Sequence, residues 1–136
     1  MRKLLISLLF LTTSSITLAN VLDNGSYTGY LQQTGYKEDA AVGSILNDQV
    51  DIYIPVLSAL GASNGLLNGT IIPTNSTTEN CITNAKFSAK LHGIPITASN
   101  ITLTNCKYEN GTFSGNYNAV VIPGISHKGI FSFNKN

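Results

Sequence analysis

The chain has few charged residues, and it does not concentrate charges of either sign. Only 11% of its 136 residues are Asp, Glu, Lys or Arg, and the formal net charge is +1. Without residues 1–19, assigned below to a leader, six lysines and no arginine stand against seven acidic residues, a formal net charge of −1. The lysines are scattered, whereas nucleic-acid binding needs a clustered basic face. We therefore expect no nucleic-acid partner.

Side chains that carry out catalysis or bind metals are also scarce. The two histidines, His92 and His127, lie far apart, and we expect both to be exposed, whereas metal sites gather several ligands at short spacing. No phosphate-binding glycine loop is present. The absence of Trp counts against a biotin site of the avidin kind. We expect no catalytic residue, no metal and no cofactor.

The N-terminal residues have the pattern of a cleaved export signal. Arg2 and Lys3 supply a positive start, an apolar run continues to Leu11, and small residues lead to a cut after Ala19. The run is far shorter than the roughly 20 apolar residues of a membrane-spanning helix. We predict a signal peptide at residues 1–19, a periplasmic or secreted location, and no integral membrane span after cleavage.

Cys81 and Cys106 are the two cysteines of the chain, and both follow the predicted leader. An even cysteine count in an exported protein predicts a disulfide. A thiol metal or redox site would favour a close C-x-x-C spacing, which these residues do not have. In the chain-entropy model, closing a loop of this size stabilises the fold by about 3.5 kcal/mol.

Turn signals are dense and helix signals are weak. No stretch shows a convincing i, i+3, i+4, i+7 apolar spacing of an amphipathic helix. Asn-Gly pairs begin at Asn24, Asn64, Asn68 and Asn110, and both residue types tolerate the positive φ of tight hairpin turns. Thr, Ser, Ile, Val and Tyr fill the stretches between. We predict one all-β domain over residues 20–136, a small antiparallel β-barrel or β-sandwich.

The clearest hairpin lies on either side of His92 and Gly93. Apolar residues at alternate positions predict an inner face, with the residues between them outside: Ala85, Phe87, Ala89 and Leu91 inside, and Lys86, Ser88 and Lys90 outside. A turn at this point pairs Leu91 with Ile94. The same register then places Phe87 opposite Ala98.

The returning strand changes parity after residues 99–100, since its apolar residues move from even to odd numbers. One extra residue there would restore the inner face, as a β-bulge does. With that bulge, Cys81 falls opposite Asn105, next to Cys106. The hairpin register and the cysteine pairing thus support each other.

Two segments with similar residue types lie near the two ends of the domain. Residues 23–29 and 109–115 match position by position, and each predicts a turn that starts a strand with an aromatic on one face. They indicate two structurally equivalent strands, or an accident of a composition rich in Asn, Gly, Ser and Thr.

The stretch from Pro55 to Leu67 carries no charge and follows a predicted strand. In that strand, Val50, Ile52, Ile54 and Val56 alternate with Asp51 and Tyr53. The uncharged stretch favours a short helix or a buried crossover on the core. The alternative is an exposed apolar loop that contacts a partner.

Tyrosines and leucines make up the candidate interaction surface. Tyr offers contact area at small cost in side-chain entropy. The candidates are Leu57, Leu60, Leu66, Leu67, Tyr27, Tyr30, Tyr53 and Tyr117.

The features together favour an exported, non-catalytic binding module: an inhibitor, an adhesin-like domain or a ligand carrier. Its partner would be an unidentified protein or small molecule, and an oligomer is compatible with the sequence. The alternative is a structural subunit of a surface assembly that forms through edge-strand pairing. A small secreted hydrolase is less favoured.

Overall fold

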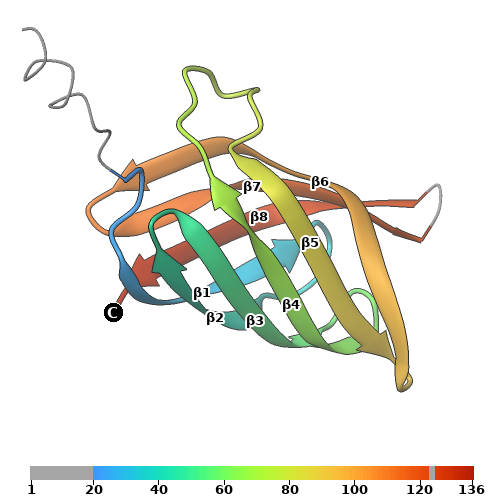
Figure 1. Ribbon diagram of the computed structural model, residues 1–136. Coiled ribbons are helices and arrows are strands. Elements are labelled where there is room, and N and C mark those ends of the chain that lie inside the picture. Colours follow the sequence, from blue (N-terminus) through green and yellow to red (C-terminus); the bar gives the residue numbers. More distant parts are fainter. Residues whose placement is uncertain (1–19, 123–124) are drawn as a thin grey trace, which may run out of the picture.

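The computed structural model describes residues 20–122 and 125–136, and the predicted signal peptide at residues 1–19 lies outside the described residues. Eight antiparallel strands pair each with the next, and the last pairs with the first, so that they form a closed barrel (Figure 1). The predicted all-β fold is confirmed, and it is a barrel and not a sandwich. The strands are β1 (Gly25–Gln33), β2 (Asp39–Leu46), β3 (Gln49–Leu57), β4 (Ala62–Ile71), β5 (Ile82–Leu91), β6 (Ile94–Glu109), β7 (Thr112–Ile122) and β8 (Ile125–Lys135).

The predicted alternation of buried and exposed residues in β3 is confirmed from Val50 to Ile54. Val50, Ile52 and Ile54 are buried, and the residues between them are exposed. Val56, expected on the inner face, is instead 57% exposed. The parity of the strand changes after Ile54: Val56 pairs with Ser63, which is also exposed, whereas the next residue, Leu57, lines the interior.

The predicted hairpin of β5 and β6 is confirmed in register and in parity. Leu91 pairs with Ile94, and Phe87 pairs with Ala98. The apolar side of β5 is buried or half-buried, while its two lysines and Ser88 are exposed. The pleat and a tight turn at His92, whose φ is 51°, therefore determine this hairpin locally.

The disulfide between Cys81 and Cys106 is confirmed, with the two Cα atoms 6.6 Å apart. The expected parity change near residues 99–100 is present, and Asn100 has a left-handed φ of 52°. A second irregularity that the sequence analysis missed lies at Asn105, with a φ of 51°. Cys81 donates its N–H to the carbonyl of Leu103 at 2.8 Å, so the detailed register around the disulfide differs from the expected one.

The uncharged stretch at residues 55–67 forms the β3–β4 hairpin, and the expected helix or crossover is not found there. Its turn closes with a hydrogen bond from Leu60 N to Leu57 O at 3.2 Å. Gly61 in the turn has a positive φ, which allows the chain to reverse here, and Asn64, already within β4, also has one. Pairing with β3 along the whole of β4 therefore overrides the local helix signal.

The segments with similar residue types near the two ends of the domain become β1 and β7, and both pair with β8. Their aromatic residues, Tyr27 and Phe113, are both buried in the core. The glycine that follows each aromatic by two positions meets backbone closely. A Cβ built on Gly29 would lie 1.9 Å from the carbonyl oxygen of Ser132. β1 and β7 are thus equivalent strands that lie on either side of β8.

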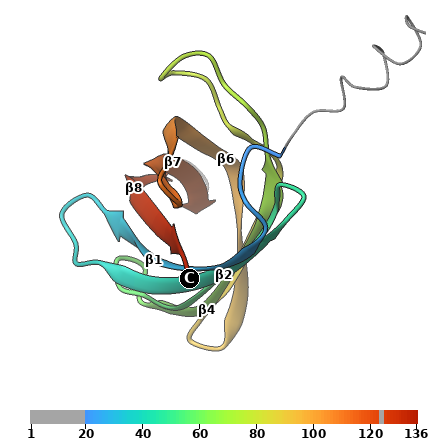
Figure 2. The same ribbon diagram turned by 90° about the vertical axis from the view of Figure 1, so that its left-hand side faces the viewer.

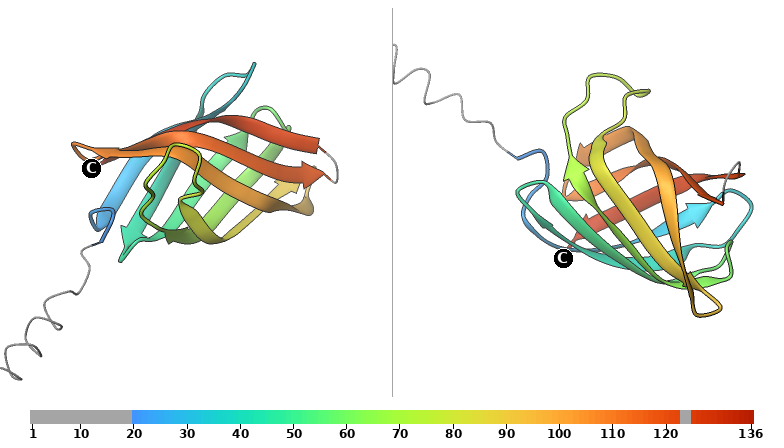
Figure 3. Two further views of the ribbon diagram at one scale, coloured as in Figure 1. Left: turned by 90° about the horizontal axis from the view of Figure 1, so that it is seen from above. Right: turned by 45° about the vertical axis from the view of Figure 1, so that its right-hand side comes forward.

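The two ends of the barrel differ. At the first, the Leu22 end (residues 20–24, the turns at 47–48 and 110–111, and the loop 72–81), Asp48 accepts hydrogen bonds from Val21 N at 2.9 Å and Leu22 N at 2.8 Å. Leu22 is 5% exposed and belongs to the core. Figure 2 looks onto this end, and Figure 3 shows the loop 72–81 projecting from the barrel. The opposite end, with the loops 34–38 and 58–61 and the turn at 92–93, is called the Ser58 end.

Candidate functional site

The interior of the barrel contains an apolar cavity of about 80 Å³. All eight strands and the turn after β3 contribute to its lining, which consists largely of Leu, Ile, Val and Phe side chains. It extends from the aromatic core toward the Ser58 end, where Ala59 and Leu60 line it. Ligand pockets in proteins are mostly apolar with a few polar groups, and this cavity has that character.

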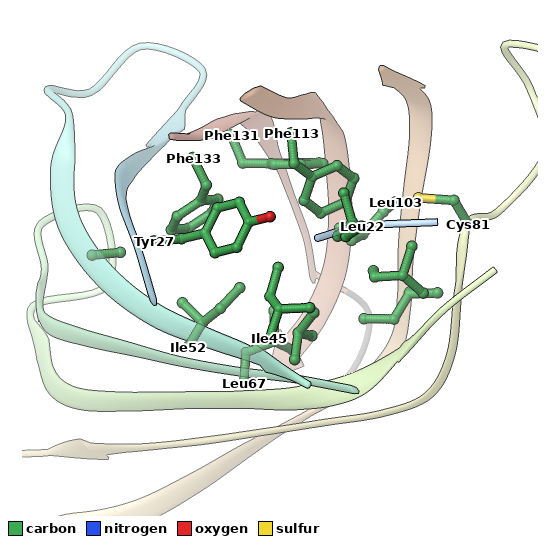
Figure 4. Packing of buried hydrophobic residues seen from close by; sticks show 14 of the residues in the cluster. Leu22, Tyr27, Ile45, Ile52, Leu67, Cys81, Leu103, Phe113, Phe131 and Phe133 are labelled. Carbon is green, nitrogen blue, oxygen red and sulfur yellow. The ribbon is translucent and has the colours of Figure 1, made fainter. Parts of the chain in front are cut away.

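Aromatic rings form one side of the cavity. Phe113 of β7 and Phe131 of β8 pack with ring centroids 4.9 Å apart in a tilted arrangement, and Phe133 lies next along β8. In Figure 4 these rings face the aliphatic side chains of Ile52 and Leu67 from the opposite wall. The inner faces of β3 and β4 and those of β7 and β8 thus supply an apolar lining.

Four polar side chains enter this lining: Gln33, Asp39, Tyr117 and His127. They come from four strands, β1, β2, β7 and β8. Gln33 and Asp39 border the loop at 34–38, and His127 lies close to the start of β8. The polar part of the cavity is therefore nearer the Ser58 end than the Leu22 end.

Asp39 is a nearly buried carboxylate, 9% exposed. One of its oxygens accepts a hydrogen bond from Ser58 N at 2.9 Å, and the other accepts from the Ser58 hydroxyl. These bonds join the start of β2 to the turn after β3. Asp39 thus fixes the Ser58 end and places a negative charge beside the cavity.

Tyr117 presents a neutral phenol to the cavity. Burial raises the pKa of Tyr117 to about 12, and the nearby charge of Asp39 adds to this shift. The hydroxyl therefore keeps its proton at physiological pH and can donate a hydrogen bond.

His127 contributes a half-buried imidazole. Its Nδ1 lies 3.1 Å from Oε1 of Gln33. Its Nε2 is buried and has no hydrogen-bond partner among the residues that the structure describes. Asn118 Oδ1 is likewise buried without a described partner, but Asn118 lies between two cavity-lining residues of β7 and so points to the other face.

The residues predicted as an interaction surface do not form one surface. Tyr27 and Leu67 are buried, Tyr30 is half-buried, and Leu57, Leu60 and Tyr117 line the cavity together with Leu67. Tyr53 and Leu66 instead lie outside, paired across β3 and β4, with 38% and 48% of their surface exposed. The predicted set therefore divides between the interior and the outer face.

The sequence pattern does not identify Gln33, Asp39 or His127 as site residues. It predicts an exposed His127, whereas the structure places the ring in the lining of the cavity. The signal that could have identified it is parity, because His127 shares the odd-numbered face of β8 with Phe131 and Phe133. His92 is exposed, as expected.

Within residues 20–122 and 125–136, no group of three or more His, Cys, Asp or Glu side chains could bind a metal ion. The same residues form no helix that is long and apolar enough to cross a membrane. Comparisons with protein-family models, curated proteins and solved structures give no match for this chain. The cavity and its polar residues are therefore the basis for a functional proposal.

Proposed function

We propose that this protein is an exported, non-catalytic binding protein that encloses a small, mainly apolar molecule inside its barrel. The observation that carries the proposal is the apolar cavity with polar side chains near one end. Apolar cavities tend to stay dry, and an apolar ligand that enters one gains contacts without displacing ordered water.

The size of the cavity limits the ligand. An engineered apolar cavity of about 150 Å³ binds benzene, and this one measures about 80 Å³. The enclosed part of the ligand would thus be a small ring or a short aliphatic group, and a larger molecule would extend toward the Ser58 end. The N-terminal residues bound to Asp48 favour entry at the Ser58 end.

The proposed location follows from the predicted leader and from the disulfide. A disulfide is compatible with an oxidising, exported environment. The leader itself is tested by the intact mass of the exported protein, which should correspond to a chain that begins at Asn20. A mass that includes Met1 would contradict cleavage.

The alternative of a surface assembly through edge-strand pairing has less support. Across the described residues, each strand has a hydrogen-bonded neighbour on both sides over part or all of its length, so no strand is a free edge throughout. Size-exclusion chromatography separates the two proposals, because assembly predicts a ladder of oligomers.

Cavity filling tests the binding proposal. The change is Ala119→Phe, since Ala119 lines the cavity on β7. The added ring should occupy the space and weaken the binding of a small apolar ring such as benzene by about tenfold or more. NMR titration of the mature protein gives the affinity.

Ala40→Phe is the matched control, because Ala40 lies exposed on the outer face of β2. This variant should bind benzene as the unmodified protein does. Failure of the unmodified protein to bind any small apolar molecule would contradict the proposal, and so would equal weakening by the two substitutions.

A further inference from the structure

The orientation of His127 gives its imidazole a defined hydrogen-bonding character. Amide oxygen can only accept a hydrogen bond, so the contact with Gln33 Oε1 requires the proton of the neutral ring to be on Nδ1. Nε2 then carries a lone pair and acts as an acceptor. Gln33 is the residue that sets this tautomer.

The acceptor at Nε2 lacks a described partner although it is buried. A buried polar atom without a hydrogen bond costs free energy, and such atoms are uncommon in native proteins. His127 belongs to the cavity lining, and so does Ala119, its partner across β7 and β8. A molecule in the cavity that carries a hydrogen-bond donor would satisfy this atom.

The cavity disfavours ions of both signs. The carboxylate of Asp39 lines it and would repel an anion. Both oxygens of that carboxylate already accept hydrogen bonds from Ser58, and the remaining lining is almost wholly apolar, so the site offsets little of the cost of desolvating a cation.

We propose that the cavity selects small, uncharged molecules whose apolar body carries one hydroxyl or N–H group, and that this group donates a hydrogen bond to His127 Nε2. The inference rests on the proposed binding function and specifies its ligand class. Gln33 acts as a positioning residue, because its amide oxygen fixes the proton on Nδ1.

Three matched probes test the selectivity: cyclopentanol, cyclopentanone and cyclopentane. They share a rigid five-membered carbon ring, and they differ in carrying a donor, an acceptor or neither. NMR titration of Tyr117→Phe, which lacks the phenol that could donate to the ketone, should give an affinity for cyclopentanol about tenfold higher than for either of the others. In His127→Phe, cyclopentane should still bind, and the preference for the alcohol should disappear.

The imidazole nitrogen chemical shifts test the tautomer without any ligand. In the free protein, His127 should show a protonated Nδ1 and an unprotonated Nε2. Gln33→Leu should shift the proton toward Nε2 and reduce the preference for the alcohol. Gln32→Leu is the matched control, since Gln32 precedes Gln33 on β1 and its amide donates to Tyr36 O instead.

The outcomes separate the two proposals. If none of the three probes binds, the binding function is wrong and the inference falls with it. If cyclopentane binds and cyclopentanone binds as tightly as cyclopentanol, the binding function stands and the inference is wrong. A protonated Nε2 in the free protein would also overturn the inference.

Discussion

Tyr117 and Tyr108 are phenols whose ionisation the fold opposes. Burial raises the pKa of each from 10.0 to about 12, with a smaller contribution from Asp39 for Tyr117 and from Asp48 for Tyr108. Above about pH 10, phenols of the unfolded chain lose protons that the folded protein still retains. The folded state is then disfavoured relative to the unfolded state, and stability falls as pH rises.

We expect this contribution to the unfolding free energy to be fully present below about pH 10 and lost between about pH 10 and 12. Tyr117→Phe removes one of these groups, so the stability of the variant should fall less steeply in that interval. Urea titrations at a series of alkaline pH values measure the slope. Tyr36→Phe, at a site 49% exposed, serves as the control and should keep the original slope. An unchanged slope in Tyr117→Phe would contradict the burial effect.

Individual site residues were the hardest to predict from the sequence. A lone histidine in a polar stretch resembles a surface residue, and His127 stands next to Lys128 in the sequence. Its burial depends on which face of β8 points inward, and Phe131 and Phe133 decide this from four and six positions away. Gln33 and Asp39 lie on either side of a loop, so their approach to the cavity requires the closed barrel.

At the scale of the strands, local pairing was predictable and long-range closure was not. The register of β5 with β6 follows from alternation and a tight turn, both of which lie within one short stretch. The pairing of β1 with β8 joins residues about a hundred positions apart, such as Tyr27 and Lys135. No local pattern specifies that contact, which is why the sequence left barrel and sandwich open.

The closure between β1 and β8 depends on close backbone approach at two glycines. A Cβ on Gly29 would lie 1.9 Å from Ser132 O and 2.7 Å from Phe133 Cα. A Cβ on Gly129 would lie 2.0 Å from Gln32 O. These neighbours are backbone atoms, so relief would require the two strands to separate.

Gly29→Ala should therefore destabilise the barrel by about 3 kcal/mol or more, near the upper range for overpacking. Gly43→Ala is the matched control within β2, where the nearest atoms to an added Cβ are 3.2 Å away. Its effect on the unfolding free energy should stay within about 1 kcal/mol. The stabilisation that alanine provides over glycine in a strand should offset the cost of the tight contact. Urea unfolding measures both. Equal effects would mean that the β1–β8 approach is looser than described.

At the scale of the whole molecule, the barrel has a place where neighbouring strands separate. β5 and β6 pair from Phe87 to Leu91, whereas β6 goes on pairing with β7 as far as Glu109. Across the separation, the disulfide and two backbone hydrogen bonds of 2.8 Å connect the loop 72–81 and the residue before β5 to β6. Closure of the barrel near the Leu22 end thus depends on contacts other than a regular ladder.

The double substitution of Cys81→Ser and Cys106→Ser should accordingly weaken this side of the barrel first. We expect a loss of about 2–5 kcal/mol in the unfolding free energy, the usual cost of removing a native disulfide from a small exported domain. Hydrogen exchange should quicken at the amides of residue 81 and Asn105, because both donate across the separation. The amides of β1 and β8, which pair along seven positions, should keep their protection in proportion to global stability.

Thiol labelling of the unreduced, unfolded protein is the control and should find no free thiol. If the variant lost less than about 1 kcal/mol and exchange at these two amides stayed slow, the hydrogen bonds alone would suffice to join β5 to β6.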